Sequence, residues 1–290
     1  MATDTAELLK KVRRIELKTK GLSNQIFSGE YHSAFKGRGM AFSEVREYAV
    51  GDEVRTIDWN VTARFGHPYV KIFEEERELT VILVVDISQS DSFGTRDQLK
   101  KGIITEICAV LAFSAITNND KIGVIFFSET IEKYIPPKKG KSHILRIIRE
   151  LIELKPQSQG TNIGHALRFL NNVVKKRSIA FLISDFMDQN YEDPLKLANK
   201  KHDLVALQIY DQREREMPDL GLVQFVDPET NEVRWVNTSA KSVRLAYAKN
   251  AQDRMFFAAQ ACKRAGVDLA TIGTHESYIA PLRNLFSKRN

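Results

Sequence analysis

Cysteine is scarce in this sequence, and histidines in metal-binding spacing are missing. The chain has 290 residues and two cysteines, Cys108 and Cys262, which lie far apart within segments of helical spacing. We interpret both as buried free thiols, because such a distant pair suits neither a disulfide framework nor a metal site. None of the 6 histidines shows a ligand spacing such as H-E-x-x-H, so the sequence does not predict zinc.

Long apolar runs are also missing. The longest, residues 79–86, has the length of a strand and ends in a carboxylate, whereas a membrane-spanning helix needs roughly 18–20 apolar residues. The first 20 residues carry charges throughout and contain no apolar signal-peptide core. These absences predict a cytoplasmic protein with no integral membrane segment.

A strong charge bias is absent as well. The formal net charge is +6, from 43 Lys and Arg against 37 Asp and Glu. Basic residues concentrate at residues 10–14 and 287–290, and the rest of the chain mixes both signs. The sequence contains no basic stripe interleaved with aromatic residues, so we expect a solvated surface and no nucleic-acid partner.

From residue 79 onward the sequence alternates strand and helix patterns. Continuous apolar runs, typical of strands covered on both faces, occur at residues 79–86, 121–128, 178–185, 203–210 and 267–273. Segments of helical spacing lie between or beside them, at residues 96–117, 141–154, 161–176, 193–200 and 240–266. This order predicts an α/β domain with a mostly parallel sheet and helices on both faces.

Two β-like pieces depart from the alternation. Residues 35–78 have glycines that break short runs of aromatic and β-branched residues, and residues 221–238 hold two such runs joined by a turn. Helical spacing over residues 4–20 begins the chain. We therefore divide the chain into residues 1–78, a helix with a small β-rich module, and residues 79–290, an α/β domain with an inserted β-hairpin.

Oxygen-bearing side chains follow three segments of the predicted α/β domain. Asp86, Ser88 and Ser90 form the sequence D-I-S-Q-S after the first strand, Thr161 opens a helix, and Asp185 closes a central strand. Because the carboxyl ends of parallel strands meet at one edge of a sheet, we expect the three loops to converge. Hydroxyl and carboxylate oxygens suit Mg²⁺, or Mn²⁺ or Ca²⁺, and leave the ion able to accept a carboxylate from a partner protein.

At these five positions the sequence resembles the von Willebrand factor A family. The resemblance implies a Rossmann-like fold, a divalent cation held at the five residues, and metal-bridged protein binding without turnover. The alternative at any single position is a purely local one, in which Asp86 and Ser88 cap the next helix and Thr161 is an N-cap.

Residues 37–78 resemble the signature of a bacterial family called domain of unknown function number 58. Its elements are G-x-G-x-x-F, R-E-Y-x-x-G-D-x-x-R-x-I-D-W-x-x-T-A-R and F-x-E-E-R. The second element contains Arg46, Gly51, Asp52, Arg55, Asp58, Trp59 and Arg64. This family is typically encoded beside MoxR-type AAA+ ATPases, so the resemblance implies such an ATPase as a partner.

The charged residues of this signature allow two interpretations. Arg46, Arg55 and Arg64 could pair with Asp52 and Asp58 in a network that fixes the β-rich module to the α/β domain, with the tryptophan as its apolar anchor. Alternatively, the arginines form a surface for an acidic partner. We favour the network, because alternating opposite charges beside a tryptophan suit internal docking.

Together these patterns predict a non-enzymatic, metal-dependent protein-interaction module that works with a MoxR-type AAA+ ATPase. The alternative is a metal-dependent hydrolase or phosphatase that uses Asp86 and Asp185, since carboxylates at strand ends also serve phosphoryl transfer. Two features of the sequence disfavour it. D-I-S-Q-S holds no second carboxylate, and no Lys or Arg lies at a fixed offset that would clamp a phosphoryl group.

Overall fold

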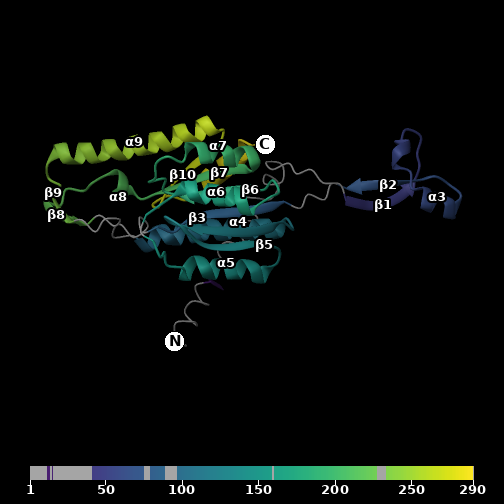
Figure 1. Cartoon of the computed structure of the whole chain (residues 1–290), viewed down its shortest axis with the longest axis horizontal. Helices are drawn as coiled ribbons and strands as arrows, with labels where there is room; N and C mark the ends of the chain where they lie inside the picture. Colours follow the sequence, from purple (N-terminus) through teal and green to yellow (C-terminus); the bar gives the residue numbers. More distant parts are fainter. Residues whose placement is uncertain are drawn as a thin grey trace, which may run out of the picture. The chain divides into compact units, whose positions relative to one another are not determined.

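The computed structural model describes residues 12, 13, 15, 41–74, 79–88, 97–158, 160–226 and 233–289. These residues divide into two compact units (Figure 1). The small unit lies within Lys36–Leu79, and the large unit contains Thr80–Asn290 together with the described residues near the N-terminus. The helix predicted over residues 4–20 falls mostly outside the described residues, of which residues 12, 13 and 15 are helical.

The small unit consists of one antiparallel strand pair with helical turns between its strands. Strand β1 (Ala41–Glu47) pairs with β2 (Tyr69–Glu74). The 3-10 helix η1 (Val54–Thr56) and the helix α3 (Trp59–Phe65) connect them. Helix α3 begins where the Asp58 carboxylate accepts hydrogen bonds from two backbone N–H groups, and it ends at Gly66, whose φ of 74° suits a residue without Cβ.

The large unit is built on a sheet of six strands in the order β10-β7-β6-β3-β4-β5. The bounds are β3 (Thr80–Asp86), β4 (Lys121–Phe127), β5 (Ile131–Lys138), β6 (Ile179–Ser184), β7 (Asp203–Tyr210) and β10 (Asp268–Gly273). All neighbouring pairs are parallel except β4 with β5. Every residue of β6 is buried, which explains why the central strands are continuous apolar runs.

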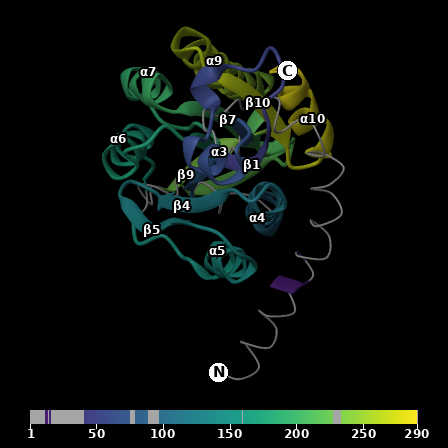
Figure 2. The same ribbon diagram turned by 90° about the vertical axis from the view of Figure 1, so that its right-hand side faces the viewer.

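Helices cover both faces of this sheet. Figure 2 shows α6 (Ile163–Val173), α7 (Glu192–Lys201) and α9 (Lys241–Ala265) on one side, and α4 (Asp97–Thr117), α5 (Lys141–Glu153) and α10 (Ile279–Ser287) on the other. Apolar side chains of α6, α7 and α9 form a core with those of the central strands, for example Leu167, Leu195 and Ala258 with Val84 and Leu182. The predicted α/β fold, with a mostly parallel sheet and helices on both faces, is confirmed.

The remaining elements of the large unit lie between β7 and α9. The short helix α8 (Gln212–Arg215) follows β7 directly. Strands β8 (Leu222–Val226) and β9 (Val233–Asn237) then form an antiparallel pair at the place where the sequence indicates a hairpin. Among the described residues, none of the helices combines the length and the apolar character that a membrane span requires.

Strand β3 is the point at which the order of the sheet reverses. The chain continues from β3 to β4 on one side and returns to β6 on the other side. The loops after these strands therefore diverge in opposite directions, and open α/β sheets expose ligand sites at such a point, outside the carboxyl ends of the strands. The two carboxylates of the predicted metal site, Asp86 and Asp185, follow β3 and β6 and thus lie at this position.

Candidate metal centre

Asp86 and the end of β6 are held together by a direct hydrogen bond. Strands β3 and β6 are parallel neighbours, with Val85 opposite Ile183, so Asp86 lies beside Ser184. The Ser184 hydroxyl donates to Asp86 Oδ2 at 2.6 Å. The backbone N–H of Ser88 donates to Asp86 Oδ1 at 3.0 Å, and Ser88 is itself buried. Asp86, Ser88 and Asp185 therefore share one buried edge.

The loop that carries Thr161 crosses the end of β3. The N–H of Asn162 donates to the carbonyl of Ser128, just after β4, at 2.9 Å. The N–H of Ile163 donates to Asp188 Oδ2, just after β6, at 2.7 Å. Because β3 lies between β4 and β6, these two bonds tie the loop across the carboxyl end of β3, where Asp86 is located.

The Thr161 hydroxyl is the most informative atom of this loop. Its Oγ1 is buried and has no hydrogen-bond partner among the described residues. A buried hydroxyl without a partner costs about 1–3 kcal/mol, which an ordered water or a bound ligand would recover. The local alternative fails for this residue, because the N-cap of α6 is Asn162, whose side chain accepts from the N–H of His165.

The two carboxylates are buried close enough to repel each other. Asp86 is 4% exposed and Asp185 is 7% exposed. Burial, and after it the negative charge of Asp185, raise the pKa of Asp86 to about 6. The hydrogen bonds from Ser184 and Ser88 oppose this shift without cancelling it. Two negative charges in such a place require compensation by positive charge.

Part of this compensation comes from a residue that the sequence did not identify. Lys100, in α4, is 3% exposed. Its Nζ lies 2.9 Å from Asp185 Oδ2 and 2.9 Å from Glu214 Oε1 in α8. The sequence did contain one sign that Lys100 is buried. Its spacing places it on the same helix face as Ile104 and Ile107, which are core residues. A basic residue thus lies beside the carboxylates, although it pairs with Asp185 and Glu214.

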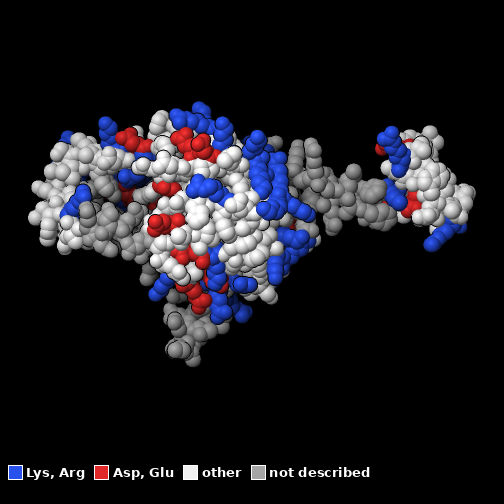
Figure 3. Space-filling view, in the orientation of Figure 1, with Lys and Arg blue, Asp and Glu red and all other residues white. Residues whose placement is uncertain are grey.

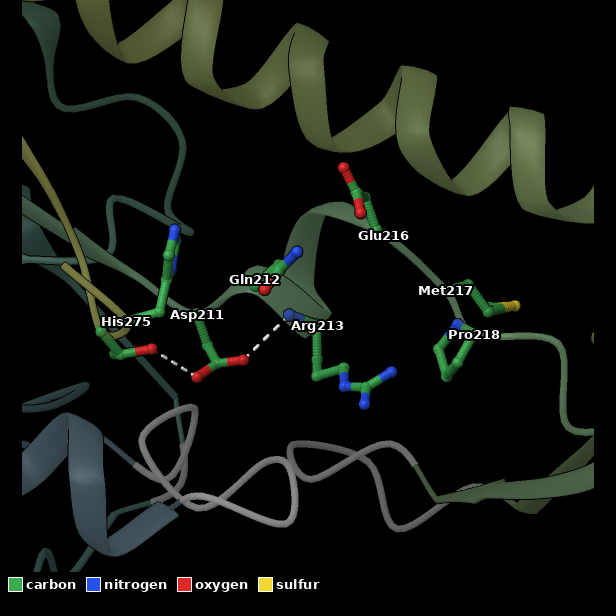
Figure 4. A pocket seen from close by; sticks show the side chains of 8 residues that line it. Asp211, Gln212, Arg213, Glu216, Met217, Pro218 and His275 are labelled. Carbon is green, nitrogen blue, oxygen red and sulfur yellow. Dashed lines mark hydrogen bonds between the residues drawn. The ribbon is translucent and has the colours of Figure 1, made fainter.

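Helix α8 is fixed by further hydrogen bonds around Asp211. Glu214 Oε2 accepts from the N–H of Asp211 at 3.0 Å, and Asp211 accepts from the N–H of Arg213 and from the Thr274 hydroxyl. Asp211, Arg213 and Thr274 line a hollow of about 240 Å³ (Figure 4). Asp211 turns toward Thr274 and Arg213, while Glu216 points toward α9 (Figure 4). The polar side chains that line the hollow point in different directions (Figure 4).

The donor set fits a hard divalent cation. No group of three or more His, Cys, Asp and Glu side chains in the described part of the chain is arranged to hold a metal. A cation here would therefore depend on the hydroxyls of Ser88 and Thr161. The carboxylates of Asp86 and Asp185 already accept hydrogen bonds within the protein, which suits contact with the ion through water. Ser90, the fifth predicted ligand, lies outside the described residues.

The signature residues of the small unit form two ion pairs within that unit. Arg46 binds Asp52 through both carboxylate oxygens, each at 2.7 Å. Asp58 caps α3 and lies 3.4 Å from Lys71. Both pairs link parts of the same module and are exposed or half-buried, so their contribution to stability is small.

The tryptophan of the signature is exposed in the small unit, and its role as an apolar anchor stays a prediction. Trp59 is 66% exposed. A helix of seven residues can pack one face only, and the half-buried face of α3 carries Val61 and Thr62. Arg55 and Arg64 are exposed as well. The small unit therefore presents Trp59 and two arginines on its surface, and both interpretations of the signature, internal docking and a partner surface, stay open.

Comparisons with known sequences identify a family and several relatives of this chain. The family model described as "Protein of unknown function DUF58" matches residues 44–255. Uncharacterized protein Rv1480 of Mycobacterium tuberculosis is 27% identical over 289 residues, which covers 99% of this chain and 91% of that protein.

Two solved structures from Bacteroides are similar over most of the chain. The conserved hypothetical protein BatB from Bacteroides thetaiotaomicron is 18% identical with a TM-score of 0.44, covering 73% of this chain and 98% of that one. An aerotolerance-related membrane protein from Bacteroides fragilis is 16% identical with a TM-score of 0.46, covering 72% and 99% of the two chains.

Proposed function

The chain belongs to the DUF58 family, and from this premise and the geometry of the site we propose that it is a cytoplasmic, non-enzymatic module that binds a partner protein through a divalent cation. Mg²⁺ is the proposed ion, with Mn²⁺ or Ca²⁺ as chemical substitutes. The proposed ligands are Asp86, Ser88, Ser90, Thr161 and Asp185. The proposed partner is a MoxR-type AAA+ ATPase, as the family resemblance implies.

The observation that carries this proposal is the buried Thr161 hydroxyl without a hydrogen-bond partner. It lies on the loop that crosses the end of β3. Asp86 and Asp185 are buried at the same end of the sheet, and Lys100 pairs with both Asp185 and Glu214. A cation ligated by the hydroxyls would satisfy Thr161 and would offset the repulsion that raises the pKa of Asp86.

The mode of partner binding follows from the same donor set. A divalent cation held mainly by neutral hydroxyls retains Lewis acidity and can accept one more anionic oxygen. Residues of this chain hold the two carboxylates in place. Ser184 and the Ser88 N–H donate to Asp86, and Lys100 donates to Asp185. A surface Asp or Glu of the partner is the ligand with the matching charge.

The partner experiment uses calorimetry with the full chain and a purified MoxR-type ATPase. Binding should be present in Mg²⁺, lost in EDTA and restored when Mg²⁺ is added back. The double variant Ser88→Ala/Ser90→Ala should fail to bind even with Mg²⁺, because two hydroxyl ligands are gone. Ser142→Ala, an exposed serine at the start of α5, is the matched control and should bind like wild type.

Chelation separates a metal bridge from simple charge attraction. A contact driven by charge alone weakens smoothly with salt and does not respond to EDTA. Undiminished binding in EDTA at physiological ionic strength would contradict the metal bridge and would leave the fold assignment intact.

The alternative of a metal-dependent phosphatase has one observation in its favour, the position of Lys100 beside Asp185. Lys100 is engaged by two carboxylates, which makes it a structural counter-charge more than a clamp for phosphate. The test is hydrolysis of a generic phosphomonoester with Mg²⁺. Turnover that disappears in Asp86→Ala would favour the phosphatase over the interaction module.

A further inference from the structure

The edge of the sheet opposite the metal site collects basic residues from distant parts of the chain. We call this the amino edge, because the parallel strands begin there. It is formed by residues 118–121, 138–141, 174–178, 200–203, 266–268 and 288–289. Residues 138–141 join it because β5 is antiparallel and ends where its neighbours begin.

Direct contacts show that these segments meet. The N–H of Asp203 donates to the carbonyl of Ser178 at 2.9 Å, and the Ser178 hydroxyl lies 3.0 Å from His202 Nδ1. Arg289, at the end of the chain, contacts both Asp203 and Asp268. Residues 174–178, 200–203, 266–268 and 288–289 therefore meet at one end of the sheet.

The charge of this surface is strongly positive. Its six segments contain eleven Lys and Arg residues against three Asp residues. This excess is larger than the net charge of +6 of the whole chain, so the rest of the sequence is slightly negative on balance. Figure 3 shows Lys and Arg gathered over one end of the large unit, while both signs mix elsewhere on the visible face.

The three aspartates do little to neutralise the exposed lysines. Asp120 is buried, and Asp203 and Asp268 both pair with Arg289. The exposed basic residues of the edge include Lys138, Lys175, Lys176, Arg177 and Lys200. Residues 75–78, which precede β3 in the sequence, lie outside the described residues.

The kind of basic residue indicates the kind of partner. Nine of the eleven are lysines, whose ammonium groups act as hydrated point charges, whereas recognition of single phosphates or of bases favours the planar arginine fork. None of the large apolar side chains that are exposed in the described part of the chain lies in the six segments. The surface thus has no platform for stacking bases and no wedge for insertion into lipid.

We infer that the amino edge docks the protein electrostatically on a membrane surface rich in anionic phospholipids. Clusters of lysines attract such a surface without specific geometry, and the attraction decays within a Debye length of about 8–10 Å. A strand of seven residues separates the two edges of the sheet by about 20 Å. The docked protein would therefore present the metal site away from the membrane, accessible to a partner.

The experiment is sedimentation of the full chain with vesicles. Wild type should bind vesicles of equal parts phosphatidylcholine and phosphatidylglycerol at low salt, should not bind pure phosphatidylcholine, and should be released as salt rises. A variant with Lys138, Lys175, Lys176 and Lys200 changed to Gln should lose at least about tenfold in its partition coefficient. These side chains are exposed, so the thermal midpoint should not change.

The matched control removes the same charge elsewhere on the large unit, by changing Lys155, Lys241, Lys249 and Arg254 to Gln. It should keep vesicle binding within about twofold of wild type, since these residues lie away from the amino edge. Equal losses in both variants, or equal binding of wild type to neutral vesicles, would overturn the inference. Tighter binding to duplex DNA than to anionic vesicles, lost in the first variant, would also overturn it and would assign the edge to nucleic acid.

Discussion

Replacing Lys100 by methionine should lower the free energy of unfolding by about 3–5 kcal/mol. The substitution keeps most of the volume of the side chain and removes the ammonium that lies 2.9 Å from both Asp185 and Glu214. Both carboxylates would remain buried without their common counter-charge, and Asp185 would also remain close to the negative charge of Asp86. The loss is large because desolvated charges are destabilising when unpaired.

Urea unfolding in EDTA at pH 7, followed by circular dichroism, measures this effect. Lys101→Met is the matched control, because Lys101 is the next residue of α4 and donates one hydrogen bond to the carbonyl of Leu154. Its loss should be limited to about 1–2 kcal/mol. Similar values for the two variants would show that Lys100 does not have the special position that the structure gives it.

The second large effect is the response of thermal stability to metal. A cation present at about 100 times its dissociation constant stabilises the folded state by about 2.7 kcal/mol. For a domain of this size that corresponds to a rise of about 5–10 °C in the thermal midpoint of wild type. Asp86→Asn should abolish the rise, since it removes a proposed ligand while keeping the shape of the side chain.

Asp188→Asn is the control for this measurement. Asp188 lies at the same edge and accepts a hydrogen bond from the N–H of Ile163, and it is not a proposed ligand. The variant should respond to Mg²⁺ as wild type does, even if its midpoint in EDTA is lower. If all three proteins respond alike to Mg²⁺ and to chelator, Asp86 is not a ligand.

The sheet and the place of the site were predictable because both depend on local patterns. Buried parallel strands are continuous apolar runs, and the register of β3 and β6 brings Asp86 beside Ser184 without further specification. The metal, the MoxR-type partner and the participation of Ser90 stay predictions.

Lys100 and the amino edge were not predictable because they depend on contacts between distant residues. Lys100 meets partners that lie 85 and 114 positions away in the sequence. A single lysine in a helix normally indicates solvent, and only the fold shows that this one is enclosed. The basic residues of the amino edge are likewise mixed with acidic ones along the chain and become a surface only when the strands align.

The exposure of Trp59 within the small unit was not predictable for a different reason. Composition identifies an apolar residue among charges, but it does not tell which face of a seven-residue helix packs against its two strands. The exposed tryptophan, with Arg55 and Arg64, is left as a surface on the small unit.

Calorimetric titration of the metal-free chain with Mn²⁺ tests the central claim most directly, through Thr161. The hydroxyl of this residue is buried without a partner among the described residues, so Thr161→Ser should retain binding of one ion per chain, whereas the isosteric Thr161→Val should lose at least about tenfold in affinity. Equal affinity of wild type, Thr161→Ser and Thr161→Val, or no binding by wild type, would contradict a cation held at this site.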